Sequence, residues 1–167
     1  AVSPSPAYAG QVRYVAKVAP IILAVYARQG EVTRLNNIEA LRNYRIGAMD
    51  VPELNELLDS AAIRYEPLTK SSSGFAMLQL GRFDLLVSDV LPELVVADQA
   101  GPKLQRVMIL ARVERWLACH PQLPPAQLNA LRLAMDEGVF ATSVTRVWQH
   151  YGLSSVYDEV RREWVEP

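Results

Sequence analysis

Residues 75–94, FAMLQLGRFDLLVSDVLPEL, contain the clearest structural signal in this sequence. A helix-like run ends at Gly81, and an apolar, strand-like run follows over residues 83–87. Asp84 lies at the start of this strand and is expected to be structural, whereas Asp89 lies just beyond its end. Because a carboxylate is costly to place at the tip of a buried strand, Asp89 is the first candidate for a functional residue.

The composition indicates a globular protein without a strong net charge. Of the 167 residues, 50% are hydrophobic and 21% are charged, and the net charge is −1. This length suits one domain or two small lobes, and the balanced charge offers no basic surface to nucleic acid or to a membrane. The longest apolar run, Val18–Ala27, is too short to span a bilayer. We therefore expect a small polar partner, no nucleic acid and no membrane insertion.

Strand-like and helix-like segments alternate along the chain. We predict strands at residues 14–28 (broken near Pro20), 44–48, 63–68, 83–89, 106–112 and 113–121, and helices at 36–44, 50–62, 71–81, 92–101, 124–138, 139–152 and 154–164. Asn36 or Asn37 is the expected N-cap of the first helix, Asp50 that of the second and a serine that of the third. The alternation predicts an α/β fold with a mostly parallel sheet flanked by helices.

The sequence contains no motif for a metal, a cofactor or nucleophilic catalysis. Its two histidines, His120 and His150, have no metal-ligand spacing around them, so we expect no metal and no cofactor. The segment RIGAMD has a single glycine and does not match a phosphate-binding loop, and SSSG does not match a nucleophile elbow. The single cysteine, Cys119, is expected to be a small buried thiol.

Two strand-to-helix junctions carry the candidate ligand-binding residues. In open α/β sheets, ligands bind beyond the carboxyl ends of the strands, where helix N-termini present N–H groups. One strand delivers Met49, Asp50 and Val51 to such an edge. The next delivers Ser88 and Asp89 to the same edge if the two strands are parallel neighbours. Each aspartate has two interpretations: it caps the following helix, or it faces a cleft, where Asp89 would pair with a ligand ammonium group.

Three segments, in this order, resemble the type 2 periplasmic solute-binding proteins, specifically the amino-acid-binding proteins of ABC importers (bacterial family 3). They are IEALRNYRIGAMDVPELNELL, LQLGRFDLLVSD and WLACHPQLPPAQLNALRLAMDEGVFATSVTRVWQHYG. In that family, the strand after Leu-x-x-Gly-Arg-x-Asp closes with an aspartate that binds the α-amino group of the ligand. The resemblance places this role on Asp89. The complete set of ligand-binding candidates is Asp89, Ser88, Asp50, Met49, Val51, Ser72 and Tyr14.

The chain departs from the pattern of this family in two places. Family members usually have Gly with Ser or Thr where this chain has Asp50 to Pro52; Pro52 lacks an N–H and Asp50 would repel a carboxylate, which argues against a ligand α-carboxylate there. The first lobe of the family has no counterpart in this sequence. We predict a linker or hinge at residues 1–13, a second-lobe α/β domain at 14–118, and a C-terminal helical segment at 119–167 that normally returns to the first lobe.

These features predict a non-catalytic solute-binding module of a transporter or receptor, which binds a small polar ligand such as an amino acid or an amine in a cleft. The expected partners are this ligand and either an ABC permease or a fused signalling domain. The expected location is the periplasm, with the signal peptide removed. Two alternatives stay open: a regulatory or interaction domain that has lost its ligand, and a dehydratase-like enzyme in which Asp89 or Asp50 is a general acid or base.

Overall fold

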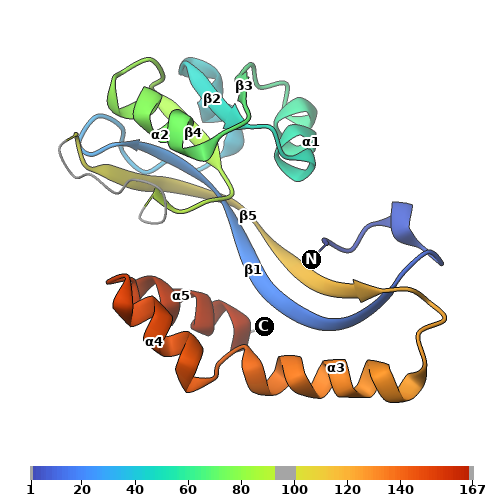
Figure 1. The fold of residues 1–167 in the computed structure, drawn as a ribbon. Coiled ribbons are helices and arrows are strands. Elements are labelled where there is room, and N and C mark those ends of the chain that lie inside the picture. The colour runs from blue at the N-terminus through green and yellow to red at the C-terminus, as the bar shows by residue number, and fades with distance from the viewer. Residues whose placement is uncertain (1, 93–100, 166–167) are drawn as a thin grey trace. The chain divides into compact units, whose positions relative to one another are not determined.

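The computed structural model describes residues 2–92 and 101–165 (Figure 1). The chain forms two compact units, which we call the central unit, Ile22–Arg112, and the terminal unit, Ala1–Ile21 with Val113–Pro167. The chain passes from one unit to the other inside two long strands. The assignment of residues 14–118 as a second lobe therefore stays a prediction, since the units divide the chain at other points.

The central unit contains one sheet with helices packed against it, which confirms the predicted α/β fold. Its elements are β1 (Arg13–Arg28, from Ile22 on), a 3-10 helix (Ile38–Asn43), β2 (Ile46–Met49), α1 (Pro52–Ser60), β3 (Glu66–Leu68), α2 (Ser71–Gln79), β4 (Leu85–Ser88) and β5 (Leu104–Cys119, up to Arg112). The strand order is β3-β2-β4-β1-β5. Strands β3, β2 and β4 are parallel, and β1 pairs with β4 in the antiparallel direction.

The core of the central unit lies between this sheet and its helices. All residues of β2 and β4 are buried, and α2 packs on β2, β3 and β4. The rings of Phe75 on α2 and Tyr26 on β1 meet edge to face with centroids 5.6 Å apart. Gly47 allows a close approach to this layer, because a Cβ there would lie 2.7 Å from the Phe83 ring. Packing of this kind explains why a glycine interrupts an otherwise apolar strand.

Two predicted breaks between strands are wrong. Strand β1 runs without interruption through Pro20; β4 pairs only with its segment Ala24–Tyr26, so Pro20 removes no hydrogen bond from that ladder. The predicted strands 106–112 and 113–121 form the single strand β5. No glycine or proline lies between Leu104 and Cys119 to end a strand there.

The predicted N-cap residues are correct in one case and wrong in two. The Asn37 side chain accepts a hydrogen bond from the Ala40 N–H at 3.0 Å, as an N-cap does. The N-cap of α1 is Val51 rather than Asp50, and that of α2 is Lys70 rather than a serine; neither makes a side-chain cap hydrogen bond. The helix predicted at 92–101 falls mostly on residues 93–100, which lie outside the described residues.

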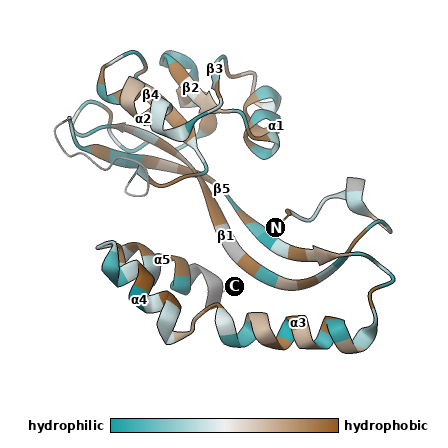
Figure 2. Ribbon diagram, in the orientation of Figure 1, coloured by the Kyte–Doolittle hydropathy of each residue, from teal (hydrophilic) through white to brown (hydrophobic). Residues whose placement is uncertain are grey.

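The terminal unit contains the outer halves of β1 and β5, a short 3-10 helix (Pro6–Tyr8) and the helices α3 (Pro125–Gly138), α4 (Thr142–His150) and α5 (Ser154–Val165). Polar and apolar residues alternate along these helices (Figure 2). Among the side chains that the structure describes here, the buried apolar ones are Val15, Ala16, Leu128 and Tyr157. This unit therefore has a much thinner core than the central unit.

Removing a buried side chain from β4 should destabilise the central unit. Leu86 is completely buried in this strand, whereas Leu80 is 86% exposed after α2. We expect Leu86→Ala to lower the free energy of unfolding by about 3 kcal/mol because it leaves a cavity, and Leu80→Ala to change it by less than about 0.5 kcal/mol. Urea unfolding of both variants measures the difference. Equal losses would contradict the assignment of the core to this sheet.

The thin core of the terminal unit should appear as weak protection from hydrogen exchange. Local opening is easiest where few apolar side chains are buried. We expect the amides of α3–α5 to exchange at least about tenfold faster than those of β2 and β4. Exchange followed by NMR, residue by residue, measures this ratio. Equal protection in both units would show that the helices are held by more than the contacts described above.

Candidate functional site

The carboxyl ends of the three parallel strands meet at one edge of the central sheet. Ala48 of β2 pairs with Val87 of β4, so two residues further on, Asp50 and Asp89 leave the sheet at the same level. The backbone N–H of Asp50 donates to the Leu68 carbonyl at 2.9 Å, which ties the end of β2 to the end of β3. The structure thus brings the two predicted aspartates to one edge, which we call the ligand edge.

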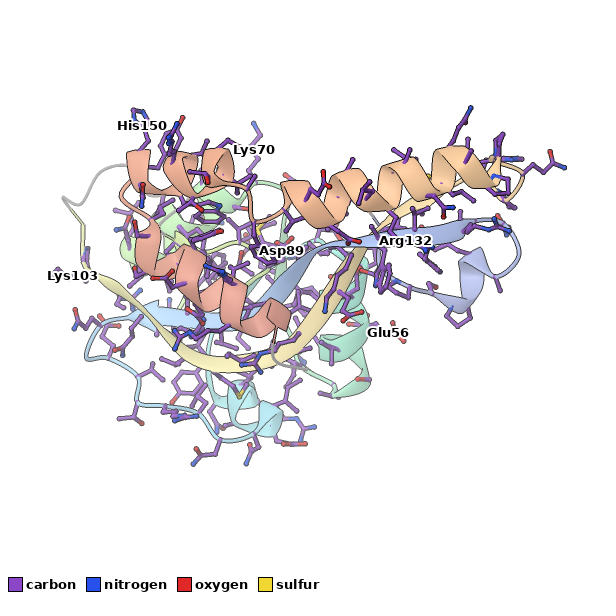
Figure 3. All side chains as sticks on the ribbon, turned by 90° about the horizontal axis from the view of Figure 1, so that it is seen from below. Glu56, Lys70, Asp89, Lys103, Arg132 and His150 are labelled. Carbon is purple, nitrogen blue, oxygen red and sulfur yellow. The ribbon has the colours of Figure 1, made fainter. Side chains whose placement is uncertain are left out.

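Asp89 follows directly on the most buried strand of the sheet. It is half-buried, and it is labelled in the side-chain view (Figure 3). The preceding Ser88 is fully buried, and its Oγ accepts a hydrogen bond from the Val90 N–H at 3.0 Å. Ser88 therefore holds the turn that places Asp89, and it exposes no surface of its own. A half-buried carboxylate in such a fixed position is suited to bind a cation.

The N-terminus of α1 offers few donors to an anion. The Val51 N–H donates to the Met49 carbonyl at 2.9 Å, and Pro52 has no N–H. The Asp50 side chain adds a negative charge, and it accepts a hydrogen bond from Asn55 Nδ2 at 2.7 Å. The bond from Asn55 is the local role of Asp50, in place of the expected cap. This side of the ligand edge is therefore unfavourable for a carboxylate.

The N-terminus of α2, which follows β3 at the same edge, has the opposite character. Its first helical hydrogen bond runs from the Gly74 N–H to the Lys70 carbonyl at 3.0 Å. The N–H groups of Ser71, Ser72 and Ser73 precede it and have no acceptor within the helix. Ser72 is exposed and Lys70 adds a positive charge. Donors and acceptors are thus divided between two sides of the ligand edge.

The remaining candidates contribute less to this edge. Met49 is only 6% exposed and belongs to the core, and Val51 is the half-buried N-cap of α1. Tyr14 lies in the terminal unit, where its ring meets that of Trp116 edge to face and its hydroxyl accepts a hydrogen bond from the Ser5 N–H at 3.3 Å. Tyr14 is therefore not part of the set that the central sheet brings together.

At the amino end of β4, charged side chains form hydrogen bonds and an ion pair within the protein. The Asp84 carboxylate accepts hydrogen bonds from the Arg45 N–H, Nε and guanidinium nitrogen at 2.9, 3.2 and 2.7 Å. The hydrogen bonds from the Arg45 side chain lower the pKa of Asp84. Arg28, at the end of β1, is buried and donates to the carbonyls of Leu78 and Phe83 and to Glu31. No local sequence pattern indicates this role of Arg28, because two of its partners are distant backbone carbonyls.

The Asp84–Arg45 pair should make stability depend on pH. Because the folded-state pKa of Asp84 lies below its unfolded value of about 3.9, the pair stabilises the protein above that pH and loses this effect as the pH falls through the folded-state pKa. We expect Asp84→Asn to lower the free energy of unfolding by about 1 kcal/mol at neutral pH and by much less at about pH 2. Urea unfolding at both pH values checks this, with the exposed Asp136→Asn as the control. A loss that is the same at both pH values would contradict it.

In the part of the chain that the structure describes, no group of three or more His, Cys, Asp and Glu side chains is arranged to hold a metal ion. The described helices include none that combines the length and the apolar character needed to cross a membrane.

Comparison with known proteins yields structural but no sequence relatives. No protein-family model matches this chain, and no curated protein matches it either. A mutant of arginine-bound ArgBP from T. maritima has a TM-score of 0.62 and 16% identity, over 81% of this chain and 64% of its own. A histidine kinase sensor domain with similarity to periplasmic binding proteins has a TM-score of 0.62 and 15% identity, over 99% of this chain and 68% of its own.

A third solved structure, the substrate-binding protein of an amino acid ABC transporter, has a TM-score of 0.59 and 13% identity, over 99% of this chain and 69% of its own. This chain thus spans about two thirds of the length of the solved structures that it resembles. At these identities the likeness establishes the fold, which is that of the type 2 periplasmic-binding proteins, as the sequence resemblance predicted.

Proposed function

We propose that this chain is a non-catalytic solute-binding module whose Asp89 pairs with the ammonium group of a small polar ligand. The observation that carries the proposal is the position of Asp89, half-buried beyond the carboxyl end of β4 and level with the end of β2. Ligands of open α/β sheets bind at such edges. An ammonium group suits a carboxylate that is partly withdrawn from water, because charge-assisted hydrogen bonds are stronger there.

The surroundings of Asp89 favour a ligand that is an amine or an amino acid held mainly by its amino group. Asp50 and Pro52 make the α1 side unfavourable for a carboxylate, whereas the N–H groups at the start of α2 are suited to donate hydrogen bonds to oxygen atoms of the ligand. In this arrangement Ser72 contributes a hydrogen-bond donor, and Ser88, Met49 and Val51 pack beneath the ligand edge and support it. Tyr14, on the terminal unit, stays a predicted contact.

The names of the structural neighbours support two contexts for such a module. One neighbour belongs to an amino acid ABC transporter and another is the sensor domain of a histidine kinase. We propose that this chain delivers its ligand to an ABC permease or reports it to a fused signalling domain, and that it works in the periplasm. Both roles require reversible binding of a small molecule and no chemical step.

A second candidate function is a regulatory domain that has lost its ligand. It is favoured by one observation, the hydrogen bond of 2.7 Å between Asn55 Nδ2 and Asp50. This bond and Pro52 occupy the helix N-terminus at which an anionic group would otherwise be bound. A domain of this kind would keep the fold and the turn at Ser88, but no compound would stabilise it.

Ligand-dependent stability tests the proposal. A compound at about 100 times its dissociation constant stabilises a protein by roughly 2.7 kcal/mol, which for a chain of this length raises Tm by roughly 5–10 °C. We expect such a shift with at least one member of a panel of amino acids, arginine included, and of diamines and polyamines. The same compound should give no shift with Asp89→Asn, which removes the charge and keeps the shape.

The matched control for this experiment is Asp136→Asn, which removes an exposed carboxylate from α3 and should retain the full shift. A Tm shift that persists in Asp89→Asn would show that the ligand does not bind at Asp89. The absence of a shift with every amine in the panel would favour the regulatory domain instead.

A further inference from the structure

A cavity lies at the other end of the central unit from Asp89. It has a volume of about 730 Å³ and lies between the loop after β1 and the start of β5. We call it the distal pocket; its walls come from residues 29–34 and 105–109. Because β1 runs antiparallel to β4, the loop after Arg28 begins at the amino end of β4, whereas Asp89 follows its carboxyl end. The volume is in the range of small-molecule sites.

Hydrogen bonds between the two walls hold the distal pocket in shape. The Gln29 N–H donates to the Lys103 carbonyl at 2.7 Å, and the Leu35 N–H donates to the Val107 carbonyl at 3.1 Å. The Gln105 side chain crosses the gap as well, with its Nε2 at 2.9 Å from the Val32 carbonyl. Figure 3 labels Lys103, which precedes β5. The loop is therefore fixed to the edge strand at several points, and the pocket exists before any ligand enters.

The lining of the distal pocket is positively charged. Arg34 lies on the loop and Arg106 on β5, and no acidic residue is among the described residues of the lining. Glu31, the carboxylate of the loop, is instead bonded to Arg28, with its oxygens at 2.7 and 2.5 Å from the guanidinium nitrogens. Among the described residues, no carboxylate forms an ion pair with Arg34. The positive charge of Arg34 is therefore not neutralised by the loop's own acid.

The rest of the lining is apolar or neutral. Val32 and Val107 are buried, and Met108 and Ile109 are half-buried beside them. The neutral polar residues of the lining are Gln29, Thr33 and Gln105. An apolar surface next to two guanidinium groups is complementary to a molecule with an apolar chain and one anionic head, since arginine binds carboxylates in a bidentate manner.

We propose that the distal pocket binds a small organic carboxylate, with its anionic head at Arg34, where Arg106 adds positive charge, and its short apolar chain against Val32 and Ile109. This site is separate from the ligand edge and has the opposite charge. It does not depend on the function proposed for Asp89, and an amine suited to Asp89 would be repelled by the two arginines.

NMR spectra of this chain with three probes test the proposal. Hexanoate carries the anionic head and the apolar chain, hexylamine carries the chain with a positive head, and inorganic phosphate carries the anion alone. With each probe at about 10 mM, enough to occupy a site of millimolar affinity, we expect hexanoate to shift the amide signals of Thr33, Gln105 and Ile109. Hexylamine should leave these signals unchanged, and phosphate should shift them much less.

Paired substitutions identify the groups responsible. The double variant Arg34→Gln with Arg106→Gln should bind hexanoate at least about tenfold more weakly, because each charge-assisted hydrogen bond that is lost costs about that factor. The double variant with lysine at both positions should retain part of the affinity, since it keeps the charge and loses the bidentate geometry. Arg64→Gln, another exposed arginine of the central unit, and Asp89→Ala should bind hexanoate as the unchanged chain does.

Several results would overturn the proposal. They are the absence of hexanoate-induced shifts at these amides, equal shifts with hexylamine, shifts with phosphate as large as those with hexanoate, and undiminished hexanoate binding in the double glutamine variant. The dispersion of the same spectra reports whether each variant is folded, so a loss of binding is distinguished from a loss of structure. Binding of hexanoate here is also independent of whether any amine binds at Asp89.

Discussion

Strand β4 is the element on which the arrangement of the central unit depends. It is hydrogen-bonded on both edges, to β2 in the parallel and to β1 in the antiparallel direction, and all of its residues, Leu85–Ser88, are buried. Such a strand cannot shift without breaking both ladders and leaving buried backbone groups unpaired. It therefore fixes the level at which each neighbouring strand leaves the sheet, and with it the position of Asp89 beside Asp50.

The two ends of β4 differ in how their charged groups are hydrogen-bonded. At the amino end, Arg28 donates hydrogen bonds to the backbone carbonyls of Leu78 and Phe83 and to Glu31, and Asp84 is paired with Arg45. Charged groups that are paired in this way favour one arrangement and leave little capacity for a ligand. At the carboxyl end, Asp89 is half-buried and is followed by a turn that Ser88 fixes. The Asp89 carboxylate can therefore accept hydrogen bonds from a ligand at this end, which is where ligands of open α/β sheets bind.

Local patterns in the sequence were sufficient where the structure follows local rules. The run from Phe75 to Asp89 gives helix, turn at Gly81 (φ +76°) and strand as predicted. The prediction of Asp50 as an N-cap is wrong although the local sequence pattern for it is complete. The Asp50 N–H donates to the Leu68 carbonyl, which keeps the backbone in the sheet for one more residue, so the helix begins later. The partners of Arg28 and the walls of the distal pocket come from segments far apart in the chain, so no local pattern indicates them.

Charge alone cannot couple the two ends of the central unit. Five residue steps of strand separate the level of Asp84 from that of Asp89, a distance of about 16 Å. This exceeds the Debye length of about 8 Å at physiological ionic strength, so an exposed charge at the distal pocket acts only weakly on the ligand edge. Any coupling would have to pass through β4 and β1, which are packed too closely to deform gradually. Each end is therefore expected to select its ligand by its own charge, an amine at Asp89 and a carboxylate at Arg34, and to bind it independently of the other.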